Sequence, residues 1–169
     1  DILRDSFGID LMLMGSGAIR SYSLGPVVHY ADLVECLPYD DAVYMLKVTG
    51  AQLERMLRHV LRDEAFQGEH TEFYQFSHGM HIVWSRSAQA FRALTLDGEP
   101  LYADRLYTVA MQKYHYNNLK AFLNITLEEA EENGRTRVLS TSARDVVEEY
   151  LMVNQHLNRR VEGRLVVED

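Results

Sequence analysis

The amino-acid sequence predicts a single α+β domain, with a mixed β-sheet packed by helices. Three observations predict this class. Short apolar runs of strand length interleave irregularly with amphipathic helical stretches, one turn signal indicates a hairpin, and 47% of the 169 residues are hydrophobic while 25% are charged. A regular alternation of strands and helices would instead indicate a parallel α/β sheet. A chain of this length buries roughly 70% of its unfolded surface, which is enough for a stable core without disulfides or metals.

The first half of the chain contains two predicted strands and two predicted helices. Residues 9–14 and 43–48 are short apolar runs, interpreted as buried strands. Residues 30–37 are interpreted as a short helix that stops before a proline, because the residue ahead of a proline avoids the helical region. Thr49 is expected to cap the second helix, with Gln52 as its capping-box partner. The apolar residues of that helix have the spacing of one buried stripe: Leu53, Met56, Leu57, Val60 and Leu61.

The second half is richer in predicted strands. Their expected positions are residues 80–84, 90–96, 106–111, 136–139 and 164–167. Asp97 and Gly98 form a turn signal after the second of these segments. Ser140, Thr141 and Ser142 supply caps for a long helix that is expected to reach about residue 158.

Charge and composition exclude several classes of protein. Lys and Arg number 17 against 25 Asp and Glu, and the net charge of −8 argues against a nucleic-acid polymer as partner. A few arginines can still form a local pocket for a small anion. No run of 18 apolar residues is present, so no membrane span is predicted. The single cysteine, Cys36, excludes cysteine-based metal clusters. Because the chain begins at Asp1 without methionine, we expect it to be processed or excised from a longer polypeptide.

Motifs for catalysis or metal binding are missing from the sequence. No His-x-His, Asp-x-His or His-Glu-x-x-His pattern occurs, so no metal-binding residue is assigned. The Gly15–Gly17 segment is not a nucleophile elbow, because Met14 and Ala18 stand where that motif requires glycine. It is not a phosphate-binding P-loop either, since no Lys-Ser or Lys-Thr pair follows. We therefore assign no catalytic residue to this chain.

Two features could form a binding site. The loop from Gly15 to Arg20 either places a bidentate arginine beside an anion or is a plain turn with a surface arginine. Tyr39 and Tyr114 each follow the end of a predicted element and are flanked by Asp or Asn. Their rings either stack a nucleobase, or cap the core and place their hydroxyls at the surface.

Several weak motifs occur in an order that carries more information than any one of them. They are the strand and Gly-Ser-Gly-Ala-Ile-Arg loop at 10–20, Leu-Pro-Tyr at 37–39, the strand-Thr-Gly segment at 43–53, Tyr-Gln-Phe-Ser-His-Gly at 74–79, Gly-Glu-Pro-Leu at 98–101, Tyr-Thr-Val-Ala at 107–110 and Val-Glu-Gly-Arg-Leu at 161–165. In this order they resemble the C-terminal, substrate-specificity domain of the 5′-nucleotidase family. That family includes UDP-sugar hydrolases and 2′,3′-cyclic-nucleotide phosphodiesterases.

The resemblance implies that residues 1–169 form a substrate-binding domain and assigns roles to individual residues. Tyr39 and Tyr114 would clamp the nucleobase, and a tyrosine in place of the family's phenylalanine keeps the stacking face. Arg20 would bind near the phosphate or ribose, and Asp41 takes the position of a base-contacting asparagine. Gly15 replaces an asparagine of the family. Lys120 stands where an aspartate would bind ribose, so Asn117 or Asn118 is expected to make that contact instead.

The resemblance also implies a whole enzyme. An N-terminal catalytic domain of the same polypeptide would hold two divalent metal ions and hydrolyse nucleotide phosphate esters, as a 5′-nucleotidase or a 2′,3′-cyclic phosphodiesterase. This fragment would bind the nucleotide or nucleoside, hold no cofactor and be inactive alone. The alternative is a non-catalytic small-molecule-binding module with an aromatic pocket. Many family members act outside the cytoplasmic membrane, but the sequence leaves the compartment open.

Overall fold

The structure is a computed structural model that describes residues 1–67 and 71–169. Its helices are α1 (Ile2–Phe7), α2 (Tyr30–Cys36), α3 (Gly50–Val60), α4 (Lys113–Asn117), α5 (Leu119–Leu123), α6 (Leu127–Glu131) and α7 (Ala143–Val153), with 3-10 turns η1 (Ser16–Ala18) and η2 (Asp63–Phe66). Its strands are β1 (Leu11–Gly15), β2 (Val43–Thr49), β3 (Tyr74–Phe76), β4 (Met80–Ser85), β5 (Ala90–Leu96), β6 (Glu99–Pro100), β7 (Leu106–Gln112), β8 (Arg137–Ser140) and β9 (Leu165–Glu168).

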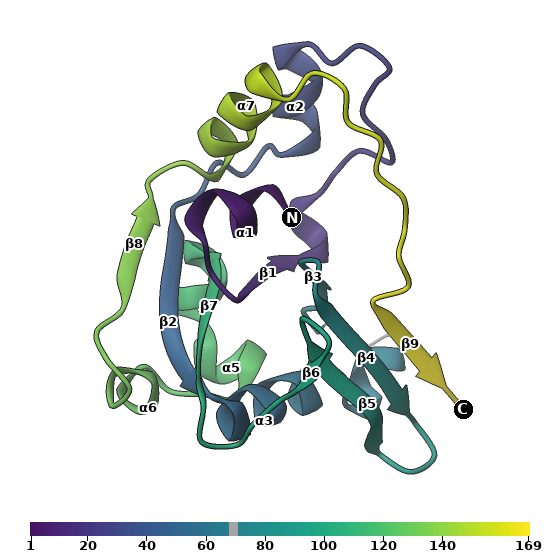
Figure 1. The fold of residues 1–169 in the computed structure, drawn as a ribbon, viewed down its shortest axis with the longest axis vertical. Helices are drawn as coiled ribbons and strands as arrows, with labels where there is room; N and C mark the ends of the chain where they lie inside the picture. Colours follow the sequence, from purple (N-terminus) through teal and green to yellow (C-terminus); the bar gives the residue numbers. More distant parts are fainter. Residues whose placement is uncertain (68–70) are drawn as a thin grey trace.

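The strands form two mixed sheets, and the predicted α+β class is confirmed. The larger sheet has the order β3-β1-β7-β2-β8, in which β1 and β7 are parallel and the other pairs are antiparallel. The smaller has the order β6-β5-β4-β9, with β9 parallel to β4. Figure 1 shows the hairpin of β4 and β5 projecting from the main body with β9 beside it.

Both faces of the larger sheet are covered, which explains why its central strands are continuous apolar runs. On β1, Leu11 and Leu13 face one core while Met12 faces the other, because successive side chains of a strand point to opposite faces. On β7, Val109 and Ala110 divide between the two cores in the same way. The first core also contains residues of α3, α5 and the smaller sheet, whereas the second contains residues of α1, α2 and α7.

The helix ends follow local chemistry. At the start of α3, Thr49 and Gln52 form the predicted reciprocal capping box, with Gln52 N–H donating to Thr49 Oγ1 at 3.2 Å and Thr49 N–H donating to Gln52 Oε1 at 2.8 Å. Helix α7 begins after Ser142 as predicted but ends at Val153, not near residue 158. The backbone N–H and side-chain amide of Asn154 both donate to the Tyr150 carbonyl at 2.9 Å, which closes the helix at that point.

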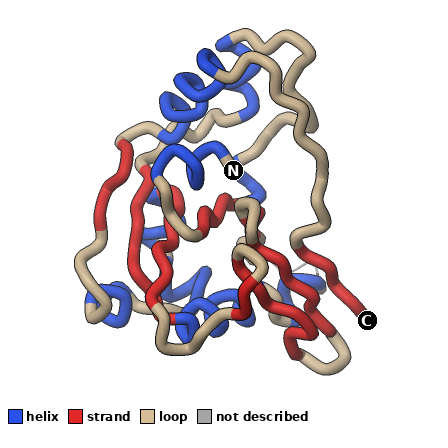
Figure 2. Tube along the Cα trace, viewed as in Figure 1, coloured by secondary structure: helices blue, strands red, loops and turns tan. Residues whose placement is uncertain are grey.

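Two long loops cross the outside of the molecule. Figure 2 shows them as tan segments, one between η1 and α2 and the other between α7 and β9. The second loop leads from α7, which packs on the larger sheet, to β9 in the smaller sheet (Figure 1). Within residues 1–67 and 71–169, no helix has both the length and the apolar character that crossing a lipid bilayer requires.

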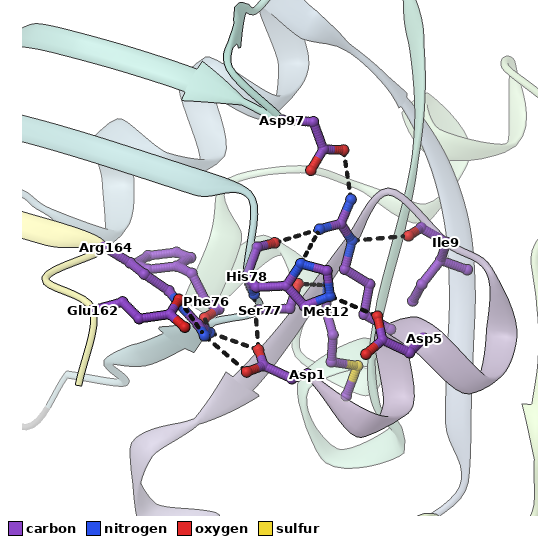
Figure 3. A network of polar contacts seen from close by, with 11 residues as sticks. Asp1, Asp5, Ile9, Met12, Phe76, Ser77, His78, Asp97, Glu162 and Arg164 are labelled. Atoms are coloured by element: carbon purple, nitrogen blue, oxygen red, sulfur yellow. Dashed lines mark hydrogen bonds and ion pairs between the residues drawn. The ribbon is translucent and has the colours of Figure 1, made fainter. Parts of the chain in front are cut away.

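A polar network ties the first helix to the smaller sheet (Figure 3). Arg4, which is buried, donates to the Ile9 carbonyl, to the His78 carbonyl and to the Asp97 carboxylate at 3.2, 2.5 and 2.5 Å. Asp1 accepts from the guanidinium of Arg164 at 2.7 and 2.8 Å, which joins the start of the chain to the segment that enters β9. Each guanidinium nitrogen of the buried Arg4 therefore has an acceptor, as the desolvation cost of such a charge requires.

Candidate ligand-binding site

One edge of the larger sheet collects the ends of four strands. Because β1 and β7 are parallel, both end at this edge, and because β2 and β3 are antiparallel to them, both begin there. The register pairs Gly15 with Tyr74 and Val43 with Gln112. Segments that are far apart in the sequence, around residues 16–20, 39–42, 72–74 and 112–115, therefore meet in space.

A cavity of about 590 Å³ lies at this edge, within the usual range for small-molecule sites. It combines aromatic, basic, acidic and amide side chains. The lining residues are Gly17, Ala18, Arg20, Tyr39, Asp40, Asp41, Glu72, Gln112, Tyr114 and His115. Four of the six predicted binding residues, Arg20, Tyr39, Asp41 and Tyr114, are thus brought to one cavity.

Arg20 is positioned against Tyr39. The N–H of Arg20 donates to the carbonyl of Cys36, the last residue of α2, at 2.8 Å, so the loop lies beside the chain that follows α2. The Arg20 guanidinium donates to the Tyr39 hydroxyl at 2.9 Å, and its central carbon lies 5.3 Å from the centre of the Tyr39 ring. A cation at this distance from a ring is attracted by the ring's negative face. The Arg20 guanidinium and the Tyr39 ring therefore lie side by side at the cavity, where one ligand could contact both.

Tyr114 is held to the same segment from the other side. Its backbone N–H, in the first turn of α4, donates to the Asp41 carboxylate at 2.7 Å. Gln112 donates from its side-chain amide to the Tyr39 carbonyl at 3.2 Å. The Tyr39 and Tyr114 rings are each 56% exposed, so neither is packed inside the core. Two half-exposed tyrosines at one cavity can contact a planar ligand.

The remaining predicted residues have other positions. Asp41 accepts the Tyr114 N–H, and its second oxygen accepts the N–H of Ala42 at 3.1 Å, so it fixes the local backbone as well as lining the cavity. Asn118 donates to the Tyr114 carbonyl at 2.8 Å. Neither Asn117 nor Asn118 is among the residues that line the cavity. The side chain of Lys120 donates to Asn124 at 3.1 Å on the surface.

His115 is a lining residue for which the sequence analysis made no prediction. It is 3% exposed, and its Nδ1 lies 3.0 Å from the Tyr74 hydroxyl. Burial lowers the pKa of His115 to about 4, against a smaller opposing effect of the Asp41 charge. Burial also raises the pKa of the Tyr74 phenol. At neutral pH both groups are therefore uncharged hydrogen-bonding partners.

The charges around the cavity favour an uncharged or mixed ligand over a simple anion. Among the described lining residues, Arg20 is the cation and Asp40, Asp41 and Glu72 are carboxylates, of which Asp40 forms an ion pair with Arg144 at 3.3 Å. In the described part of the chain, no group of three or more His, Cys, Asp or Glu side chains could hold a metal ion. The arrangement suits binding of a planar ring next to a hydroxyl or anionic group that Arg20 can reach.

His115 packs so closely against Gly15 that a larger residue at position 15 is expected to destabilise the fold. A Cβ added at Gly15 would overlap with Nε2 and Cε1 of His115, whereas nothing lies within 4 Å of a Cβ added at Gly17. Because His115 is buried and cannot easily move, we expect Gly15→Ala to lower the free energy of unfolding by at least about 1 kcal/mol. Urea unfolding of the two variants measures this. An equal effect of Gly17→Ala, expected to stay within about 0.5 kcal/mol of the wild type, would contradict the packing argument.

A mixed sheet covered on both faces, with an aromatic cavity at one edge, characterises this α+β domain. The family model described as "5′-nucleotidase, C-terminal domain" matches residues 1–125. The chain therefore belongs to this family of hydrolases, and the resemblance seen in its ordered motifs is confirmed. A search of curated protein sequences finds no match.

Solved structures have the same fold. The chain is similar to a 5′-nucleotidase precursor from Thermus thermophilus, with a TM-score of 0.75 and 17% identity over 99% of this chain and 33% of that one. It is similar to the sulfate thiohydrolase SoxB of Thermus thermophilus, with a TM-score of 0.71 and 16% identity over 98% of this chain and 30% of that one. It is also similar to the NAD nucleotidase of Haemophilus influenzae, with a TM-score of 0.70 and 13% identity over 95% of this chain and 30% of that one. The chain thus spans about a third of the length of these proteins.

Proposed function

We propose that residues 1–169 are the substrate-recognition domain of a metal-dependent phosphoesterase that hydrolyses phosphate esters of nucleotides. The observation that carries this proposal is that Tyr39 and Tyr114, each half-exposed, line one cavity together with Arg20. Family membership supports it, because the matching family is that of the 5′-nucleotidase C-terminal domain. A cavity with this lining accepts a nucleoside, which is a planar base joined to a hydroxyl-rich sugar.

Different lining residues suit chemically different parts of the ligand. Tyr39 and Tyr114 supply apolar ring faces for the base, and each such stack contributes about 1–3 kcal/mol. Arg20 supplies donors for a ribose hydroxyl or a phosphate oxygen. Asp41 lines the cavity, and although each of its oxygens already accepts one backbone N–H, an ionised carboxylate oxygen has a second lone pair for an N–H or O–H group of the ligand. The recognition step is therefore assigned to this chain.

The hydrolytic step is assigned to an N-terminal catalytic domain of the same polypeptide. Two divalent metal ions there would activate the attacking water and stabilise the charge that develops on the phosphate. The described residues of this chain offer no cluster for such ions, so no step is placed on them. The site of the whole enzyme would then lie between the two domains, with the base held here and the phosphate held opposite.

Calorimetric titration and a phosphate-release assay on the same preparation test the proposal. We expect this chain to bind a nucleoside 5′-monophosphate and to release no phosphate from it, even with Mn²⁺ or Mg²⁺ added. Phosphate release by the chain alone would contradict the assignment of hydrolysis to the N-terminal domain. Absence of binding to any nucleoside or nucleotide would contradict nucleotide recognition. Binding, combined with an upstream sequence that lacks metal-ligand motifs, would instead favour a non-catalytic binding module.

A further inference from the structure

One ring nitrogen of His115, Nε2, forms no hydrogen bond with the described residues of the chain. The imidazole is almost fully buried and lines the cavity beside Tyr114, with the two ring centres 5.3 Å apart and nearly perpendicular. Its Nδ1 is engaged by the Tyr74 hydroxyl at 3.0 Å. Within residues 1–67 and 71–169, its Nε2 has no hydrogen-bond partner. Among the described residues, the fully buried side-chain atoms without a partner are Trp84 Nε1, Arg86 Nε and Arg144 Nε, so Nε2 of His115 is open to solvent, and a ligand in the cavity can replace the water that reaches it.

The hydrogen bond to Tyr74 fixes which ring nitrogen carries the proton. Among the described residues, the Tyr74 hydroxyl is bonded to His115 and to no other group. If the phenol donates to Nδ1, the imidazole proton is on Nε2, where water can accept its hydrogen bond, whereas the reverse bond would leave the buried Tyr74 O–H without an acceptor. The phenol therefore donates to Nδ1, and the proton of the neutral imidazole sits on Nε2. His115 thus offers an N–H donor at the cavity.

Gly15 provides the room for this arrangement. Position 15 continues the face of β1 on which Leu11 and Leu13 point into the first core. A side chain here would overlap with Nε2 and Cε1 of His115. The imidazole therefore occupies space that belongs to the end of β1, and it reaches that space from α4. Such a close approach is a known reason for glycine in a strand.

We propose that His115 is a further ligand-binding residue, whose Nε2–H donates to a carbonyl oxygen or ring nitrogen of the base between Tyr39 and Tyr114. This inference rests on the proposed function, because it assumes a nucleobase in the cavity. The edge-on contact adds to stacking, which recognises any planar ring and therefore discriminates poorly between bases. His115 reads an acceptor at one position of the ring.

The test uses the full-length protein that contains this chain, with EDTA present so that nucleotide is not hydrolysed. Calorimetry ranks the affinities of AMP, GMP, CMP and UMP. The tightest ligand is then compared with analogues in which one acceptor of its base is removed at a time, either by replacing a ring nitrogen with C–H or by omitting a carbonyl oxygen. The variants are His115→Leu, which removes the donor, and His115→Gln, which retains an N–H donor. A Tyr74→Phe/His115→Leu variant, compared with Tyr74→Phe, removes the donor without leaving the phenol unpaired.

We expect one analogue to bind wild type roughly 2- to 12-fold more weakly than its parent, as the loss of one neutral hydrogen bond predicts. His115→Leu should weaken the parent by a similar factor and show no further loss with that analogue, while His115→Gln recovers part of the affinity. Equal weakening of every analogue by His115→Leu would indicate a structural role and overturn the inference alone, as would unchanged affinity. Failure of all four nucleotides to bind wild type would overturn the proposed function and the inference together.

Discussion

Replacing Tyr114 with alanine is expected to raise KM for a nucleotide substrate by roughly 5- to 150-fold in the full-length enzyme, with little change in kcat. The magnitude is that of one base stack, about 1–3 kcal/mol. The stack is remote from the phosphate, so it stabilises the bound substrate and the transition state equally, and its loss appears in KM. Steady-state kinetics with a nucleoside 5′-monophosphate separate the two constants.

Two matched variants control this prediction. Tyr114→Phe keeps the ring, its face and its contacts with His115 and Phe122, and should behave nearly as wild type. Tyr102 is similarly exposed, at 51% compared with 56% for Tyr114, but lies near Gly50 at the opposite edge of the sheet. Tyr102→Ala should leave KM unchanged. A Tyr114→Ala variant that loses kcat and keeps its KM would count against the stacking role.

The free energy of unfolding is expected to decrease as pH falls from about 6.5 to about 4, partly because of His115. Burial lowers the pKa of His115 in the folded chain to about 4 from 6.5. Between these values the unfolded chain takes up a proton on this residue while the folded chain does not, so the unfolded state is favoured. The stabilisation is complete above about pH 6.5, and about 3 kcal/mol of it is lost once the pH reaches about 4.

Comparison with His115→Gln isolates this contribution from the titration of the carboxylates and other histidines. Urea unfolding of both proteins at several pH values gives two curves of free energy of unfolding against pH. The wild-type curve should be steeper between pH 6.5 and pH 4, and the two should become parallel below pH 4. Parallel curves over the whole range would show that His115 takes up its proton at an ordinary pH in the folded chain.

Sequence patterns predicted the elements of the fold better than their pairing. Apolar runs identify β1 and β7 because both strands are buried on two faces, and the cap at Thr49 is a local feature of a few residues. The pairing of β1 with β7 joins residues about a hundred positions apart, for example Leu11 with Val109. No local pattern specifies such a contact, so the division of the strands into two sheets was not predicted.

The same distinction applies to the site. Local patterns left the roles of Arg20, Tyr39 and Tyr114 open, and the resemblance to a known family favoured binding; the parallel pairing of β1 with β7 explains why the three residues meet. His115 carries no local motif, since it is one of seven histidines and its role depends on a contact with distant Tyr74. The available signal was Gly15, a glycine at the end of an apolar strand, which indicates that another group approaches closely.

A crystal structure of the full-length protein with a nucleoside 5′-monophosphate tests the central claim most directly. We expect the base to lie between the Tyr39 and Tyr114 rings, with Arg20 in contact with the ribose or phosphate. A base bound elsewhere, or two rings that close on each other and leave the cavity to solvent when the nucleotide is bound, would contradict the account.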